Sequence, residues 1–195
     1  ALRLRRFGLA VLSYALATAL VALAWVLGVL PATTALQVSA AHVAINLGLY
    51  LVIRSGLNLR FADPSLTRFQ ILTGITVLMY IVYHIDDGRN IALFGCFVVF
   101  LFGIFRLNTR EFAVITLYTL AAYALVINLL MHLRPQAIRD VPLEWMSWLW
   151  LAGLLPCFTI IGGQINTLRR KLRESELRFR SLTEMSSDFY WESDA

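Results

Sequence analysis

Long apolar stretches separated by short polar connections make up most of the chain. Charged and turn-forming residues bound six of them, at residues 7–30, 33–53, 69–84, 91–105, 112–133 and 143–168. About 20 apolar residues is the length a helix needs to cross the hydrocarbon core of a bilayer. We therefore predict an all-α, polytopic membrane protein with six transmembrane helices, short loops and the lipid bilayer as its main partner.

The pattern becomes sparse and periodic after the sixth stretch. Residues spaced by three and four positions, all apolar except one serine, follow in the order Ile165, Leu168, Leu172, Ser175, Phe179 and Leu182. This spacing is typical of a heptad seam on one helix face. We predict that the last helix extends into a cytoplasmic coiled-coil linker and that the seam forms a homodimer. A solvated amphipathic helix is the alternative.

Pro156 lies inside the predicted sixth helix, three residues after Gly153. Proline has no amide proton, so it frees a backbone carbonyl one turn earlier and favours a kink. We interpret Pro156, together with Leu168, Leu172 and Phe179 of the seam, as the residues that relay a signal along this helix. A static bend is the alternative for Pro156.

The composition agrees with a membrane protein. Hydrophobic residues make up 59% of the chain and charged residues 15%, whereas soluble domains contain roughly 45–50% apolar residues. The mean hydropathy is +0.71. The net charge of +5 does not indicate a nucleic-acid partner, because the basic residues lie between the apolar stretches and just after the last one.

The distribution of Lys and Arg predicts the orientation in the membrane, because these residues concentrate in cytoplasmic segments. If the N-terminus is inside, the cytoplasmic segments hold Arg3, Arg5, Arg6, Arg54, Arg60, Arg68, Arg106, Arg110, Arg169, Arg170, Lys171 and Arg173. The other side holds Arg89, Arg134 and Arg139, which share their loops with acidic residues. We predict that both termini face the cytoplasm.

No catalytic set is recognisable in the sequence. The segment IGGQIN lacks the Lys-Ser/Thr of a phosphate-binding loop, and GxSxG, HExxH and GGDEF are absent. Cys96 and Cys157 have neither a CxxC spacing nor a nearby ligand set, so we interpret both as small buried residues. We expect these 195 residues to have no enzymatic activity.

Polar side chains inside the predicted membrane helices are candidates for function, because they are costly in lipid. Three pairs are spaced four residues apart, which places both members on one helix face. They are His42 with Asn46, Tyr80 with His84, and Asn128 with His132. All three histidines map to the outer halves of their helices, so we predict that they could converge on a pocket for a small apolar ligand or for a proton.

Imidazole also binds haem and metals, so a haem or metal site is a further hypothesis, which Asp86, Asp87 or Glu144 could complete. The structural alternative needs no ligand. In that interpretation Asn46 and Asn128 join helices by hydrogen bonds, while His84 and His132 lie at wet helix ends. His42 is the histidine that this alternative explains least well.

The last 24 residues, LRESELRFRSLTEMSSDFYWESDA, resemble the linker helix and N-terminal cap that begin a PAS domain in bacterial signalling proteins. The resemblance rests on Glu176, Phe179, Arg180, Leu182 and the run SSDFYWESD, in which Phe189 and Trp191 would start the first strand. It implies a transmembrane sensor domain at 1–168, a cytoplasmic signalling helix at 169–182 and the start of a truncated PAS domain at 183–195.

The membrane part is similar to the six-helix sensor modules that precede bacterial diguanylate cyclases, some adenylate cyclases and histidine kinases. The segments RFADPSLTRFQ and GGQINTLRRKLRESE carry this likeness. It implies an input domain in the bacterial inner membrane, ahead of a diguanylate cyclase that makes cyclic di-GMP, with or without a phosphodiesterase domain. A histidine kinase is the second expectation, and a small transporter or channel is the alternative from another class.

Overall fold

Residues 2–61, 63–86, 88–104 and 107–191 are described by a computed structural model, without the side chains of residues 2–13, 102 and 184–191. Within these residues the chain forms six α-helices, two short 3-10 helices and no strand. The α-helices are α1 (Leu2–Val26), α2 (Ala32–Arg54), α3 (Thr67–His84), α4 (Arg89–Ile104), α5 (Thr109–Leu133) and α6 (Val141–Trp191). The 3-10 helices are η1 (Leu57–Arg60) and η2 (Pro135–Ala137). The predicted all-α class and helical stretches are confirmed.

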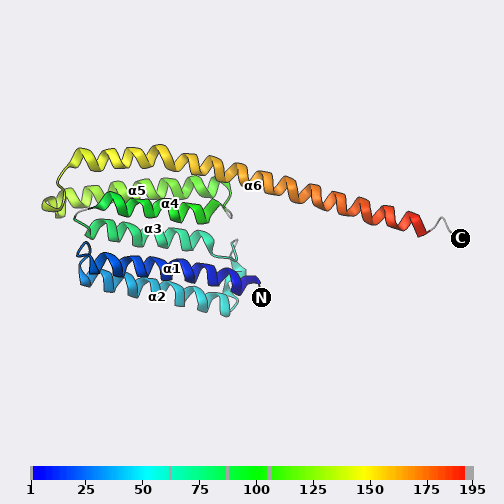
Figure 1. Ribbon diagram of the computed structural model, residues 1–195, viewed down its shortest axis with the longest axis horizontal. Coiled ribbons are helices and arrows are strands. Elements are labelled where there is room, and N and C mark those ends of the chain that lie inside the picture. The colour runs from blue at the N-terminus through cyan, green and yellow to red at the C-terminus, as the bar shows by residue number, and fades with distance from the viewer. Residues whose placement is uncertain (1, 62, 87, 105–106, 192–195) are drawn as a thin grey trace.

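The helices lie side by side and alternate in direction, as Figure 1 shows. The connections after α1, α3 and α5 lie at one end of the bundle, which we call the Arg89 end. Those after α2 and α4 lie at the opposite end, which we call the Asn108 end. Helix α6 starts at the Arg89 end, crosses the bundle and extends far beyond the Asn108 end.

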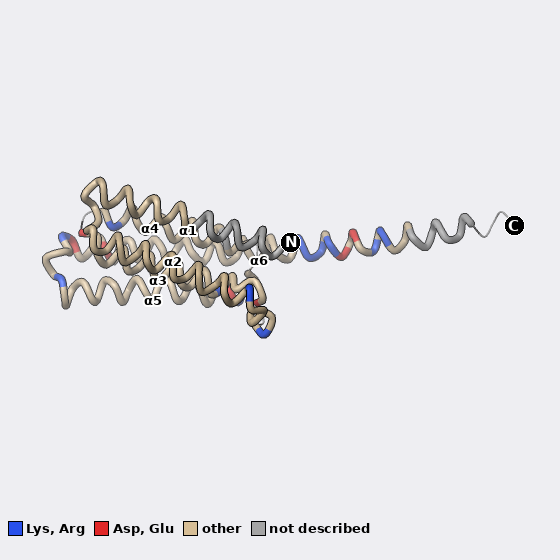
Figure 2. The backbone as a smooth tube through the Cα atoms, turned by 90° about the horizontal axis from the view of Figure 1, so that it is seen from below, with Lys and Arg blue, Asp and Glu red and all other residues tan. Residues whose placement is uncertain are grey.

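Charged residues of the bundle lie near its two ends, and the part of α6 beyond the bundle carries further ones (Figure 2). Between the two ends, large apolar side chains face outward, with exposed fractions of 66% for Val43, 70% for Leu117 and 59% for Leu125. An outward apolar surface of this kind suits lipid and not water.

Three described helices are long and apolar enough to cross a membrane, namely Ala32–Arg54, Thr109–Leu133 and the segment Val141–Thr183 of α6. Shorter apolar segments are Tyr14–Val26 and Arg89–Leu101. These helices support membrane association, while six spans stay a prediction. Helix α3 is not among the three, because Arg68, Gln70, Thr73 and Thr76 interrupt its apolar residues.

The interior has two unequal parts. The larger buried cluster joins α3, α4, α5 and α6, with Ile75, Phe100, Phe112, Ile127 and Leu155 among its members. The smaller cluster consists of Val21, Leu30, Ala35, Val38 and Ile85, from α1, α2 and the end of α3. We call α3–α6 the body and α1–α2 the hairpin.

Turn chemistry explains where several helices begin and end. Helix α1 ends at Val26, before the predicted residue 30, because Gly28 adopts a positive φ of 74° that reverses the chain. Asp63 accepts hydrogen bonds from the backbone amides of Ser65 (3.0 Å) and Arg68 (3.2 Å), which confirms the turn predicted at Asp63-Pro64-Ser65. Asn108 and Glu111 form a reciprocal capping box at the start of α5.

Two local expectations differ from the structure. Phe189 and Trp191 belong to α6, where the resemblance implied a first strand. A helix satisfies its backbone locally, whereas a strand needs partner strands to be stable. Cys96 is buried as expected, but Cys157 is exposed, because it lies on the outer face of α6 just after Pro156. Helix α6 continues without interruption through Pro156.

Candidate functional site: a buried charge network and a polar seam

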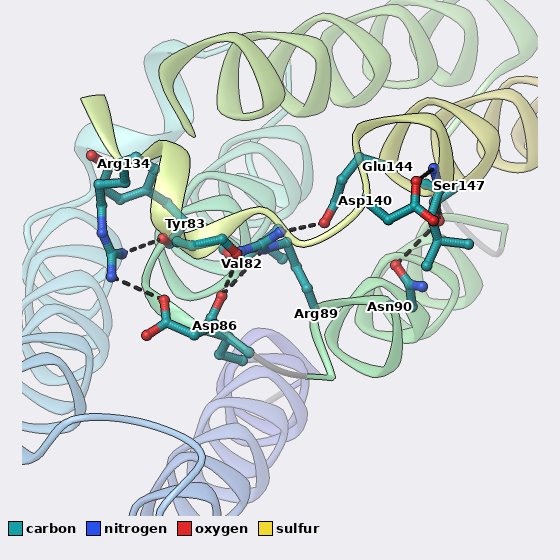
Figure 3. A network of polar contacts seen from close by, with 12 residues as sticks. Val82, Tyr83, Asp86, Arg89, Asn90, Arg134, Asp140, Glu144 and Ser147 are labelled. Carbon is teal, nitrogen blue, oxygen red and sulfur yellow. Dashed lines mark hydrogen bonds and ion pairs between the residues drawn. The ribbon is translucent and has the colours of Figure 1, made fainter. Parts of the chain in front are cut away.

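Arg89 is the central residue of a buried polar network at the Arg89 end (Figure 3). Its guanidinium donates from Nε to the backbone oxygens of Val82 (3.0 Å) and Ile85 (3.2 Å). Nη2 donates to the oxygens of Ile85 (2.9 Å) and Ala137 (3.1 Å). The last carbonyls of a helix lack intrahelical partners and carry partial negative charge, so Arg89 caps α3 and attaches the 134–140 connection to it.

Glu144 completes this network from the first turn of α6. Its Oε1 accepts an ion-paired hydrogen bond from Arg89 Nη1, and its Oε2 accepts one from the Tyr123 hydroxyl of α5 at 2.7 Å. Arg89 is only 4% exposed and Glu144 8%. Because both charges are buried and hydrogen-bonded, removing one partner would cost about 3–5 kcal/mol. The network therefore fixes the start of α6 to α3, α4 and α5.

A second arginine supports the same helix end. Arg134 donates from Nη1 to the backbone oxygen of Tyr83 at 2.8 Å and from Nη2 to Asp86 at 3.0 Å. Its guanidinium carbon lies 5.5 Å from the centre of the Tyr83 ring, within cation–π range. The sequence placed Arg89 and Arg134 in connections that also hold acidic residues. In the structure both guanidiniums turn toward the carbonyls at the end of α3.

His42 lies in the seam between the hairpin and the body. It is 5% exposed and about 15 Å along α2 from its first residue at 1.5 Å per residue. Its Nδ1 is 2.8 Å from the Thr18 hydroxyl, and its ring meets the Tyr14 ring edge-on at 5.3 Å. The Tyr14 hydroxyl is in turn 3.2 Å from both the Gln70 oxygen and the Thr73 hydroxyl of α3.

Asn46 follows His42 one turn later on α2. Its Nδ2 donates to the His42 backbone oxygen at 2.8 Å. Its Oδ1 is buried and has no hydrogen-bond partner, which holds for no other buried side-chain oxygen or nitrogen in the described part of the chain. Such unpaired buried polar atoms are rare in native proteins. The structure thus places His42 and Asn46 together, as the spacing predicted.

The other two predicted pairs lie elsewhere. The Tyr80 hydroxyl donates to Gln37 Oε1 of α2 at 2.5 Å, and His84 Nδ1 is 2.8 Å from the Tyr80 backbone oxygen. On α5, Asn128 donates to the Ala124 oxygen and His132 Nδ1 bonds the Asn128 oxygen, each at 2.8 Å. His84 and His132 thus contact residues of their own helices, and none of these contacts joins either histidine to His42.

The carboxylates that could have completed a metal site are engaged in other contacts. Glu144 pairs with Arg89 and Tyr123, Asp86 pairs with Arg134, and Asp87 lies outside the described residues. No group of three or more His, Cys, Asp or Glu in the described part of the chain could hold a metal ion. The haem or metal hypothesis therefore finds no supporting arrangement there.

A close contact between α5 and α6 lies where α6 leaves the bundle. A Cβ atom at Gly162 would be 2.7 Å from the Phe112 ring, and one at Gly163 would be 2.2 Å from the Thr109 hydroxyl. Asn166 donates to the Ile104 oxygen (3.3 Å) and also to the Leu107 oxygen. The glycines of IGGQIN, which the sequence left unexplained, thus let α6 pack directly on the start of α5.

The fold and these polar contacts define a membrane-associated helical bundle whose last helix is fixed at both ends of the body. No protein-family model, no curated protein and no solved structure matches the chain.

Proposed function

We propose that the chain is the membrane input domain of a bacterial signalling protein. In this proposal a signal that acts on the bundle changes helix packing, and α6 carries the change to a cytoplasmic PAS domain and an output domain. A diguanylate cyclase is the output we favour, and a histidine kinase is the second candidate. The chain itself supplies the receptor and no catalysis.

The observation that carries the proposal is the continuity of α6. The helix has 51 residues, which corresponds to about 75 Å at 1.5 Å per residue. It begins in the Arg89–Glu144 network, packs in the body core through Leu151 and Leu155 and continues beyond the bundle. One stiff helix therefore connects the Arg89 end of the bundle with residues far beyond the Asn108 end.

The seam on the extension supports a homodimer. Leu168, Leu172, Phe179 and Leu182 are 66%, 69%, 70% and 62% exposed in the single chain. Heptad-spaced apolar residues of this kind bury themselves against a second helix. Single cysteines at Leu168 and Leu172 should crosslink between protomers more efficiently than one at Arg170. Equal yields at the three positions would remove the coiled-coil argument.

The direct test of signal relay is a phased insertion in the longer protein. Seven residues inserted between Arg173 and Glu174 keep the seam nearly in phase, whereas two residues rotate it by about 200°, at 3.6 residues per turn. We expect the seven-residue insertion to keep signal-dependent cyclic di-GMP formation and the two-residue insertion to abolish it. If both insertions preserve the response, α6 is not the relay.

The proposed orientation rests on the arginines. At the Arg89 end, Arg89 is buried against Glu144 and Arg134 is paired with Asp86, so little uncompensated positive charge is left there. We therefore expect the Asn108 end to be cytoplasmic. A membrane-impermeant thiol reagent applied from outside should label Gln136→Cys and spare Ser55→Cys. The reverse labelling would invert the proposed topology.

A small transporter or channel is the competing function. Transporters contain inverted repeats and helices broken near the midplane, whereas α2, α5 and α6 are continuous across the bundle. Reconstitution of the chain in liposomes separates the two functions. Robust solute flux would overturn the receptor proposal.

A further inference from the structure

Two polar residues interrupt the inward face of α2. Ala35, Val38 and Leu49 of this face are buried apolar residues, and His42 and Asn46 lie between Val38 and Leu49 at one-turn spacing. Both polar side chains therefore face the seam between the hairpin and α3. The seam is the part of the described chain in which a buried polar atom has no partner.

The hydrogen bonds determine which atoms of His42 donate and accept. The Thr18 hydroxyl has one proton, which it donates to the Tyr14 backbone oxygen at 2.8 Å. The 2.8 Å contact between Thr18 Oγ1 and His42 Nδ1 therefore has the imidazole as its donor. In a neutral ring with its proton on Nδ1, Nε2 is an acceptor. No described residue donates a hydrogen bond to it.

The orientation of the Asn46 amide follows in the same way. Its Nδ2 donates to the His42 backbone oxygen, which can only accept, so the unpaired buried atom is the amide oxygen. The seam thus presents two acceptors, His42 Nε2 and Asn46 Oδ1, of which Asn46 Oδ1 is buried without a partner. Leaving a buried acceptor unsatisfied is unfavourable, so a molecule that brings a donor to Asn46 Oδ1 is stabilised there.

The charge of the surroundings narrows the class of molecule. An anion would face two acceptor atoms, whose lone pairs repel it. A cation would find no counter-charge on the neighbouring helices, because α1, α2 and α3 contain no Asp or Glu. What remains is a neutral group that donates a hydrogen bond, such as a hydroxyl group. Apolar residues around the pair, including Val38 and Leu49, suit an apolar remainder of the molecule.

We propose that the seam between α1, α2 and α3 binds a neutral, hydroxyl-bearing apolar molecule, whose O–H group donates to His42 Nε2 or Asn46 Oδ1. This inference deepens the proposed function. It rests on that function only in treating the bound ligand as the signal. The same O–H chemistry is available from a long-chain alcohol or from internal water, and the experiment distinguishes these two sources.

The test uses the whole chain in lipid nanodiscs and a photoactivatable diazirine derivative of a long-chain primary alcohol, with its methyl ether as the matched probe without a donor. We expect saturable labelling of α2 by the alcohol and at least tenfold weaker labelling by the ether. Asn46→Leu should lower labelling by the alcohol about tenfold while the unfolding midpoint stays the same or rises, because this substitution removes an unpaired acceptor.

Asn128→Leu is the matched control. Asn128 also donates to the backbone oxygen four residues earlier, but it lies on the exposed side of α5. We expect this variant to label like the unaltered chain. Equal labelling by alcohol and ether, an equal loss in Asn46→Leu and Asn128→Leu, or water at the seam without saturable labelling would each overturn the proposal.

Labelling also separates this proposal from the proposed function. It is measured on the purified chain and needs no output domain. A chain that labels as expected but gives no signalling response in the longer protein would refute the receptor function and leave the binding site standing. Signalling without labelling would refute the binding site and leave the receptor function standing.

Discussion

The hairpin and the body are built from similar apolar helices but treat their buried polar groups in opposite ways. In the body, the Arg89 guanidinium donates from all three of its nitrogens and both Glu144 oxygens are bonded. In the hairpin seam, Asn46 Oδ1 is buried without a partner. The buried polar groups of this network in the body therefore have hydrogen-bond partners in a single arrangement. The seam, in contrast, gains a hydrogen bond from any molecule or movement that supplies a donor.

The two regions also differ in how much apolar surface holds them together. The body shares the larger buried cluster, while the hairpin meets α3 through the smaller one. Hydrogen bonds from Tyr14 and Tyr80 add to this small contact. Because stability within a protein is not uniform, we expect the hairpin to separate from α3 at a lower free energy than the body helices separate from one another.

The largest effect should come from removing the central charge of the body. Arg89→Leu leaves Glu144 buried without its cation, so we expect the free energy of unfolding to fall by about 3–5 kcal/mol. This free energy is measured by unfolding the chain with a denaturing detergent in mixed micelles. Arg89→Leu combined with Glu144→Leu should recover part of the loss, because it removes both charges.

Arg134→Leu is the matched control for this prediction. Its partner Asp86 has a side chain that is 63% exposed, and such exposed ion pairs contribute about 0–1 kcal/mol. If Arg134→Leu costs as much as Arg89→Leu, burial of the Arg89 network is not what stabilises the body.

A smaller effect is expected where α6 leaves the body. Gly162→Ala places a methyl group 2.7 Å from the buried Phe112 ring, and overpacking of this kind costs about 1–3 kcal/mol. It should also lower the crosslinking yield at Leu168, because α6 must move away from α5. Thermal unfolding and crosslinking of the same variant measure both effects.

Gly153→Ala serves as the control in the same helix. A Cβ atom there meets nothing within 4 Å, and alanine is preferred over glycine inside helices by about 1 kcal/mol. We expect this variant to be as stable as the unaltered chain or slightly more stable. A loss of stability equal to that of Gly162→Ala would show that the contact with Phe112 does not decide the outcome.

The smallest effect should test the attachment of the hairpin. Tyr14→Phe removes the hydroxyl that reaches Gln70 and Thr73, and one such hydrogen bond contributes about 0.5–1.5 kcal/mol. Amide hydrogen exchange should become faster in α2 and remain unchanged in α5. Faster exchange throughout the chain would mean that the hairpin and the body open together.

Features that depend on local sequence were predictable, and those that depend on distant partners were not. The apolar stretches gave the helices, and Asp63-Pro64-Ser65 gave the turn before α3. The Arg89–Glu144 pair joins residues 55 positions apart, so no spacing rule connects them. One signal was present in the sequence, since both lie within a helical turn of a membrane helix end, where a charge with no water must find a partner.

The candidate seam was predictable only in part. The four-residue spacing placed His42 and Asn46 on one face, but the missing partner of Asn46 depends on how α1 and α3 pack against α2. The role of Gly162 and Gly163 was hidden for the same reason, because the close contact needs Phe112 and Thr109 of another helix. The exposure of Cys157 likewise depends on which face of α6 the body covers.

The contact of Gly162 and Gly163 with α5 makes α6 a lever with a fulcrum at the Asn108 end. The arm beyond it, residues 164–191, extends about 42 Å at 1.5 Å per residue. A tilt of about 10° around the fulcrum would displace the far end by about 7 Å, while atoms beside the glycines move far less. A rearrangement too small to disturb the core of the body would thereby displace the end of α6 by more than the pitch of one helix turn, about 5.4 Å.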